Sequence, residues 1–213
     1  MNTTRVITRI EELDKKRSKI YINHEFAFVL YKGELTQYKL ETEGVVEDDI
    51  YHEITQRVLP KRAKKRCLNL LQKRPYTEFK LREKLKEGYY SQEIIEDAID
   101  YVKSFRYLDD YDYACQYIFY HKEVESRKKM EEKLAIKGIS KEVLNKAFGD
   151  SYEDEDEQQE LELKQARELL GKKKYDAEAV DWKEKQKIYA FLIRKGISVS
   201  IIKKAMSLQE DAI

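Results

Sequence analysis

This chain of 213 residues is poor in the residues that interrupt helices, in cysteine and in long apolar segments. Only 7 glycines and 2 prolines are present, so few positions break a helix. The two cysteines, Cys67 and Cys115, have no close partner and no metal-type spacing, which predicts two reduced thiols. No apolar run approaches the roughly 20 residues of a membrane span, and no apolar N-terminal leader is visible. We therefore expect a cytoplasmic protein with no membrane attachment.

The sequence also lacks the residue patterns of common catalytic and metal sites. The three histidines, His24, His52 and His121, lie in separate segments, and none has a histidine or cysteine three or four residues away. There is no glycine-rich phosphate loop. The acids of residues 153–157 lack the alternation and the glycine of a calcium loop, which favours a solvated acidic linker. We expect no enzymatic activity, no cofactor and no metal site.

Charge is abundant and unevenly distributed. Charged residues make up 39% of the chain, above the roughly 25% that is usual for globular domains, yet the formal net charge is only +1. Residues 61–86 contain eleven Lys or Arg and two Glu, whereas residues 150–162 contain eight acids and no base. This segregation carries information about binding partners more than about the fold.

The first 60 residues have a different pattern from the remainder. Residues 5–10 and 19–30 are rich in Val, Ile, Tyr and Phe, and a charged turn over residues 14–17 separates them. A second turn at Lys32 and Gly33, followed by residues 34–40, completes the pattern of a two- or three-stranded meander. A helix over residues 47–59 should support this small sheet and end before Pro60.

From residue 61 onward the pattern is helical, and seven positions recur in three copies, offset by 49 and then by a further 58 residues. The copies read Leu81, Leu85, Ser91, Ile94, Ile95, Ala98 and Ile99; Met130, Leu134, Ser140, Val143, Leu144, Ala147 and Phe148; and Ile188, Leu192, Ser198, Ile201, Ile202, Ala205 and Met206. The first, second, fifth and seventh positions of each copy are the predicted core.

Each copy predicts a helix, a turn, a serine cap and a second helix. The serine hydroxyl can accept a free backbone N–H at the start of the second helix. Gly138 and Gly196 stand two residues before their serines and suit a left-handed helix end, while Tyr89 occupies the aligned position in the first copy. A further helix precedes each pair, over residues 61–73, 109–125 and 157–170.

The predicted fold is therefore mostly α: three tandem three-helix repeats in an elongated stack, with a small N-terminal β-meander plus helix. The predicted segments are residues 1–60 for the meander and helix, 61–108 for the first repeat, 109–150 for the second, and 151–213 for the third with its acidic linker.

Basic residues recur in all three repeats and could line one surface that contacts phosphates without sequence preference. The candidates are Lys61, Arg62, Lys64, Lys65, Arg66, Arg74, Arg82, Arg127, Lys128, Lys129, Lys137, Arg194 and Lys195. A solubilising face is the alternative. Base reading by a helix-turn-helix is disfavoured, since the relevant helix offers Gln92, Glu93, Glu96 and Asp97, which are mostly acids. The aromatic residues between Tyr107 and Tyr120 could stack on bases, although packing between helices is the commoner role.

The order and spacing of these motifs resemble the RecX family over nearly the whole chain. Residues 63–99 resemble its first repeat. Tyr107, Leu108 and Asp110 resemble the junction that follows, with Arg106 in place of the usual glycine and Asp109 in place of the usual asparagine. The second repeat of the family is resembled by Leu134, Lys137, Gly138 and Ile139. Its third repeat is resembled by Lys185, Ile188, Leu192, Arg194, Gly196 and Ser198.

This resemblance implies a regulator, usually an inhibitor, of the RecA recombinase that lies along the groove of the RecA–single-stranded DNA filament. It implies a role in recombination, DNA repair and the SOS response, without cofactor or catalysis. The expected partners are the RecA filament and the single-stranded DNA within it, with weak binding to DNA alone and a monomeric state. The segment 120–126 departs from the Arg- and Gly-containing pattern of the family. The alternative is a sequence-nonspecific DNA-binding or scaffold helical-repeat protein with another protein partner.

Overall fold

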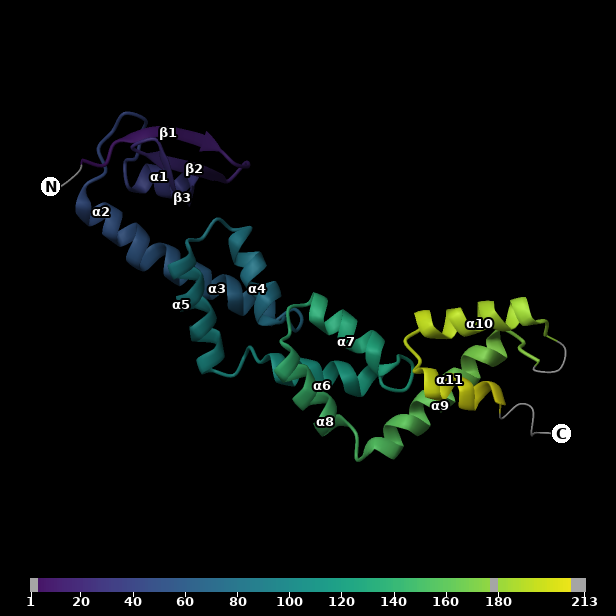
Figure 1. Cartoon of the computed structure of the whole chain (residues 1–213). Helices are drawn as coiled ribbons and strands as arrows, with labels where there is room; N and C mark the ends of the chain where they lie inside the picture. Colours follow the sequence, from purple (N-terminus) through teal and green to yellow (C-terminus); the bar gives the residue numbers. More distant parts are fainter. Residues whose placement is uncertain (1–3, 177–179, 208–213) are drawn as a thin grey trace. The chain divides into compact units, whose positions relative to one another are not determined.

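The structure, a computed structural model, describes residues 4–176 and 180–207. It is mostly helical, with one small three-stranded sheet near the N-terminus, as the sequence predicts (Figure 1). The chain forms two compact units, residues 1–109 and 110–213. Unit 1 contains the sheet and the first three-helix repeat, and unit 2 contains the second and third repeats.

The sheet is an antiparallel meander in the order β1-β2-β3, built from Ile7–Glu12, Arg17–Ile22 and Glu25–Tyr31. The charged turn before β2 is closed by Asp14, whose carboxylate accepts hydrogen bonds from the amides of Lys16 and Arg17, each at 2.9 Å. The stretch 19–30 is two strands instead of one, because Asn23 and His24 take φ values of 49° and 72° and form a tight turn.

The predicted strand over residues 34–40 is wrong, since Lys32–Gln37 form the short helix α1. The local reason is Glu34, whose carboxylate accepts a hydrogen bond from the Tyr31 amide at 2.7 Å and satisfies a donor at the start of the helix. A glycine at position 33 marks the beginning of this helix and not a hairpin turn.

Pro60 does not end the preceding helix, which corrects a second prediction. Helix α2 (Asp48–Glu53), the π-helical turn η1 (Ile54–Val58) and α3 (Leu59–Leu71) follow one another without a break. The Leu59 amide bonds to the Ile54 carbonyl five residues back. This wider turn lies just before the proline, which has no N–H to donate and stands at the first turn of α3, where proline is tolerated.

Three helices form each repeat. The first has α3, α4 (Glu78–Lys86) and α5 (Gln92–Ser104), and the second has α6 (Asp110–His121), α7 (Arg127–Ile136) and α8 (Lys141–Ser151). The third has α9 (Glu155–Lys172), α10 (Trp182–Arg194) and α11 (Val199–Ser207).

The acidic stretch is not a linker. Asp154 caps α9, accepting a hydrogen bond from the Glu157 amide, and Glu155, Asp156 and Glu157 form the first turn of that helix. Acids are favoured there because the free N–H groups make the helix N-terminus positive.

The turn chemistry of the repeats follows the sequence pattern at most positions. Ser91 and Ser140 accept hydrogen bonds from the amides three residues later. Ser198 differs, because its hydroxyl donates to Glu162 of α9 at 3.1 Å. Gly138 and Gly196 both have a φ of 87°, and Tyr89 has 62°, so the left-handed conformation is shared by all three copies.

All twelve residues of the predicted core are buried: Leu81, Leu85, Ile95, Ile99, Met130, Leu134, Leu144, Phe148, Ile188, Leu192, Ile202 and Met206. They belong to three clusters. In unit 1, the sheet residues Ile7, Ile20 and Phe28 share one core with Leu81 and Leu85, so the sheet is supported by the first repeat.

Candidate functional site

Several of the predicted basic residues in unit 1 are committed to contacts within the unit. Arg82 donates two hydrogen bonds to Glu96, at 2.8 and 2.7 Å, and another to Glu78. These bonds raise the pKa of the Arg82 guanidinium and lower that of the Glu96 carboxyl. Lys64 pairs with Asp97 at 2.9 Å. The cations therefore join α3 and α4 to the acidic face of α5.

Arg62 joins α3 to the sheet, and Arg66 joins α3 to α4. Arg62 pairs with Glu34 and also donates to the Val29 carbonyl at 3.1 Å. The Arg66 Nε donates to the Lys84 carbonyl at 3.3 Å. Arg74 lies over the Tyr76 ring, 4.7 Å from its centroid. Arg62 and Arg66 are half-buried, so neither is available as a freely exposed cation.

Lys61 and Lys65 are the exposed cations of α3. They stand four residues apart on one face of the helix, and in the described part of unit 1 neither forms an ion pair. Two more lysines are exposed: Lys73, just after the end of α3, and Lys86, the last residue of α4. We refer to Lys61 and Lys65 as the α3 lysines.

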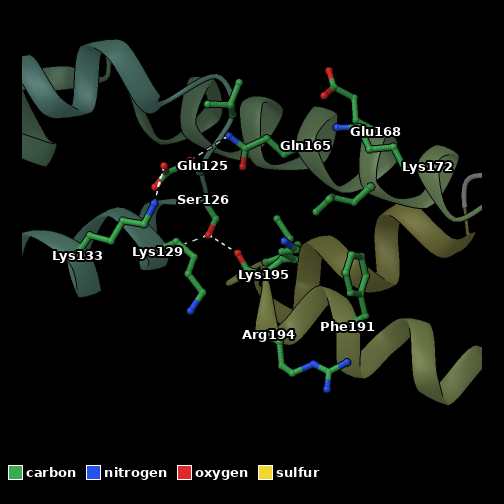
Figure 2. A pocket seen from close by; sticks show the side chains of 13 residues that line it. Glu125, Ser126, Lys129, Lys133, Gln165, Glu168, Lys172, Phe191, Arg194 and Lys195 are labelled. Carbon is green, nitrogen blue, oxygen red and sulfur yellow. Dashed lines mark hydrogen bonds and ion pairs between the residues drawn. The ribbon is translucent and has the colours of Figure 1, made fainter.

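In unit 2, a cleft of about 740 Å³ lies where the second repeat meets the third (Figure 2). One wall comes from the loop after α6 and from α7, and the other from α9, α10 and the turn after α10. The lining residues are Val124, Glu125, Ser126, Lys129, Lys133, Gln165, Glu168, Leu169, Lys172, Phe191, Arg194, Lys195 and Ile197. We refer to it as the repeat 2–3 cleft.

The two walls are held together by buried polar contacts. Ser126 caps α7 and also donates its hydroxyl hydrogen to the Lys195 carbonyl at 2.8 Å. The buried Gln165 side chain donates to the carbonyls of Lys122 and Glu125, at 2.7 and 3.2 Å. Gly196 packs so closely that a Cβ placed there would stand 2.4 Å from the Ser126 hydroxyl. These contacts fix the distance between α7 and α10 at this end of the cleft.

The cleft has a surplus of positive charge. Lys133 pairs with Glu125 at 2.7 Å, which raises the pKa of that lysine, and Lys129 pairs with Glu132 at 2.5 Å. Lys172, Arg194 and Lys195 form no ion pair among residues 4–176 and 180–207. Figure 2 shows Lys172 beside Glu168 on α9, and Arg194 on α10 extending away from α9.

The other predicted cations of unit 2 are not among the residues that line this cleft. Arg127 donates to Glu131 and Gln158, each at 2.8 Å, and lies over the Phe148 ring. Lys137 lies over the Tyr113 ring at 5.6 Å. Lys128 is exposed. About half of the thirteen predicted cations, namely Arg62, Lys64, Arg66, Arg82, Arg127 and Lys129, form hydrogen bonds or ion pairs within their own unit.

Sequence reasoning did not identify the repeat 2–3 cleft. Its walls meet through contacts between residues 40 to 69 positions apart, such as Ser126 with Lys195. A usable signal was Gln165, a polar residue in the buried stripe of α9. The aromatic residues of α6 fall into two groups. Tyr111, Tyr113 and Tyr117 pack against the second-repeat core, whereas Phe119 and Tyr120 are exposed.

Over residues 4–176 and 180–207, no group of three or more His, Cys, Asp or Glu side chains could hold a metal ion. Within the same ranges, no helix has the length and apolar character needed to cross a membrane.

Comparisons with known proteins agree on one family. Residues 63–101 match the family model described as RecX, first three-helix domain, and residues 159–206 match RecX, third three-helix domain. The Regulatory protein RecX of Finegoldia magna is 29% identical over 208 residues, covering 93% of this chain and 97% of that protein. That of Clostridium botulinum strain Eklund 17B is 28% identical, with 92% of each chain covered.

Solved structures show the same fold. A crystal structure of regulatory protein RecX aligns with a TM-score of 0.63 at 23% identity, covering 95% of this chain and 99% of that one. The crystal structure of RecX from Lactobacillus salivarius aligns with a TM-score of 0.60 at 19% identity, covering 71% and 97%.

Proposed function

This chain belongs to the RecX family, and on that basis we propose that it regulates the RecA recombinase as an inhibitor. In this proposal the protein lies along the groove of the RecA–single-stranded DNA filament and thereby modulates recombination, DNA repair and the SOS response. It acts in the cytoplasm as a binding protein, without cofactor or catalysis. The relatives' shared name, Regulatory protein RecX, supports a regulatory role.

The observation that carries the proposal is the exposed pair of α3 lysines. Residues 61–86 concentrate positive charge, and Lys61 and Lys65 remain outside the ion pairs that bind their neighbours within unit 1. A filament built on DNA presents phosphates at regular spacing. Lysines that are already exposed can bind phosphates by releasing counterions, without breaking any contact of the folded unit.

The direct test measures RecA itself. ATP hydrolysis and strand exchange by RecA on single-stranded DNA are recorded with increasing amounts of this protein. Inhibition at concentrations comparable to that of the filament sites is expected. Unchanged rates at saturating protein would reject the proposed function.

A second experiment tests which residues bind the filament. Lys61→Glu/Lys65→Glu should weaken filament binding and lower the slope of log affinity against log salt by about one to two units. The matched control is Lys15→Glu/Lys16→Glu, which changes the net charge equally at two exposed positions of unit 1. Lys64 is left unchanged because its loss would also break the pair with Asp97.

The outcomes separate the alternatives. If both double variants bind like the parent, the α3 lysines are only a solubilising face. If the parent binds naked single-stranded DNA as tightly as the coated filament, the protein is a sequence-nonspecific DNA-binding protein instead. We expect binding to naked DNA to be weaker.

A further inference from the structure

We propose that the repeat 2–3 cleft is a docking site for an acidic peptide segment of a partner protein, inserted through one large apolar side chain. The α3 lysines lie in unit 1 and share no residue with this cleft, so the proposal does not depend on how the filament is bound. The cleft would be a second binding surface for a partner, in addition to the α3 lysines.

The floor of the cleft is apolar and open. Val124 is 73% exposed, although it is a β-branched apolar residue, and it lies on the turn between α6 and α7. Leu169 and Phe191 are half-buried, and Ile197, which also lines the cleft, is buried. A volume of about 740 Å³ is within the range of sites that take a ligand or several side chains. One aromatic or leucine side chain would therefore fit among these groups and cover exposed apolar surface.

The rim selects for negative charge. The lysines of the α7 wall are matched by carboxylates, since Lys133 pairs with Glu125 and Lys129 with Glu132. On the opposite wall, Lys172, Arg194 and Lys195 lack such partners among the described residues, and Glu168 is the acid beside them. Carboxylates on a bound peptide would complement this surplus and would steer the peptide to the cleft.

Two features favour a peptide over nucleic acid. The ammonium groups of Lys173 and Lys195 lie 5.0 and 5.6 Å from the centre of the Phe191 ring. The ring is therefore already in cation–π contact, whereas base binding uses a free aromatic face. The carboxylate of Glu168 can accept a hydrogen bond from a peptide N–H, but a phosphodiester backbone has no donor to offer it and is repelled.

The experiment uses the full chain and a fluorescent 12-residue peptide of Asp and Glu with a single central Phe. Fluorescence anisotropy at moderate salt should give saturable binding. A peptide with Ala in place of Phe, and one with Asn and Gln in place of the acids, should each bind at least about tenfold more weakly, which is about 1.4 kcal/mol. Equal binding of all three peptides would overturn the proposal.

Variants locate the site. Lys172→Glu/Arg194→Glu should weaken peptide binding by about tenfold or more, since both side chains are exposed and line the cleft. The control Lys141→Glu/Lys183→Glu changes the charge of unit 2 equally, at exposed first-turn positions of α8 and α10 where an acid is tolerated. If the two variants bind the peptide equally, the cleft is not the site.

A competitor and a unit 1 variant separate this proposal from the previous one. An oligonucleotide of twelve thymidines should displace the fluorescent peptide less effectively than the unlabelled peptide does. If the oligonucleotide displaces it at a lower concentration than the unlabelled peptide, the cleft is a nucleic-acid site and the proposal is wrong. Lys61→Glu/Lys65→Glu should bind the peptide like the parent. If the parent protein binds the peptide but leaves RecA activity unchanged, only the proposed function is rejected.

Discussion

Replacing Gly196 with alanine tests how the second and third repeats are joined. Gly196 has a φ of 87°, a conformation that costs an L-residue roughly 1–2 kcal/mol. Its Cβ would stand 2.4 Å from the Ser126 hydroxyl, which donates to the Lys195 carbonyl at 2.8 Å. Displacing that hydroxyl removes a hydrogen bond worth about 1 kcal/mol. We expect Gly196→Ala to lower the free energy of unfolding of unit 2 by about 2–3 kcal/mol.

Gly138 supplies the matched control, because it has the same φ of 87° but is exposed. Gly138→Ala should show only the conformational cost, about 1 kcal/mol after the stiffer unfolded chain offsets part of it. The assay is urea unfolding followed by tryptophan fluorescence. Trp182 is the only tryptophan and lies on α10, so the signal reports on unit 2.

A double variant checks the assigned cause. If the clash with the hydroxyl is responsible, Gly196→Ala should cost less in a Ser126→Ala background than in the parent. Equal effects of Gly196→Ala and Gly138→Ala would show that the Ser126 contact adds nothing. The reasoning about the joint, and with it the fixed width of the repeat 2–3 cleft, would then be refuted.

Two further predictions concern the cores. Leu85, Leu134 and Leu192 are equivalent, fully buried positions of the three repeats. Each change to alanine should therefore lower the free energy of unfolding by about 2–5 kcal/mol, as measured by denaturant titration. Parent-like unfolding midpoints for all three variants would reject the repeat alignment. Burial raises the pKa of the Cys67 thiol to about 11. The thiol should therefore resist thiol reagents at pH 8 until the protein unfolds. Fast labelling of Cys67 in the native protein would contradict this prediction. Because the folded pKa lies above the unfolded one, the contribution of Cys67 to stability is present below about pH 8.5 and is lost as the pH rises toward 11.

The repeats could be predicted from sequence because each is specified locally. A serine cap, a left-handed position and a helical apolar stripe recur within about twenty residues, and the structure contains these features in each copy except for the role of Ser198. The N-terminal errors arose where one residue outweighed the average pattern. Asn23 begins a tight turn in an apolar stretch, Glu34 caps a helix where a strand was expected, and a π turn accommodates Pro60.

The sites could not be predicted to the same degree, because charge counts do not show which charges meet. Arg62 pairs with Glu34, 28 residues away, and Arg82 with Glu96, 14 residues away. The acids of α5, which argue against base reading by that helix, are partly used in neutralising cations of α3 and α4. The repeat 2–3 cleft depends on contacts between positions that only the folded unit brings together.

The basic residues of unit 1 differ in the kind of contact they make. Arg62 and Arg66 donate to backbone carbonyls and Arg82 donates to two carboxylates, while the exposed positions of α3 are lysines. A guanidinium offers several fixed donors and is weakly hydrated, so it can bind a carboxylate and a carbonyl together at low cost in a half-buried place. An ammonium is compact and strongly hydrated, and is best left in water, where it can exchange counterions for phosphates. On α3, residue type therefore separates Arg62 and Arg66, which bond within unit 1, from Lys61 and Lys65, which stay exposed and available to a partner, while Lys64 forms a single ion pair with Asp97.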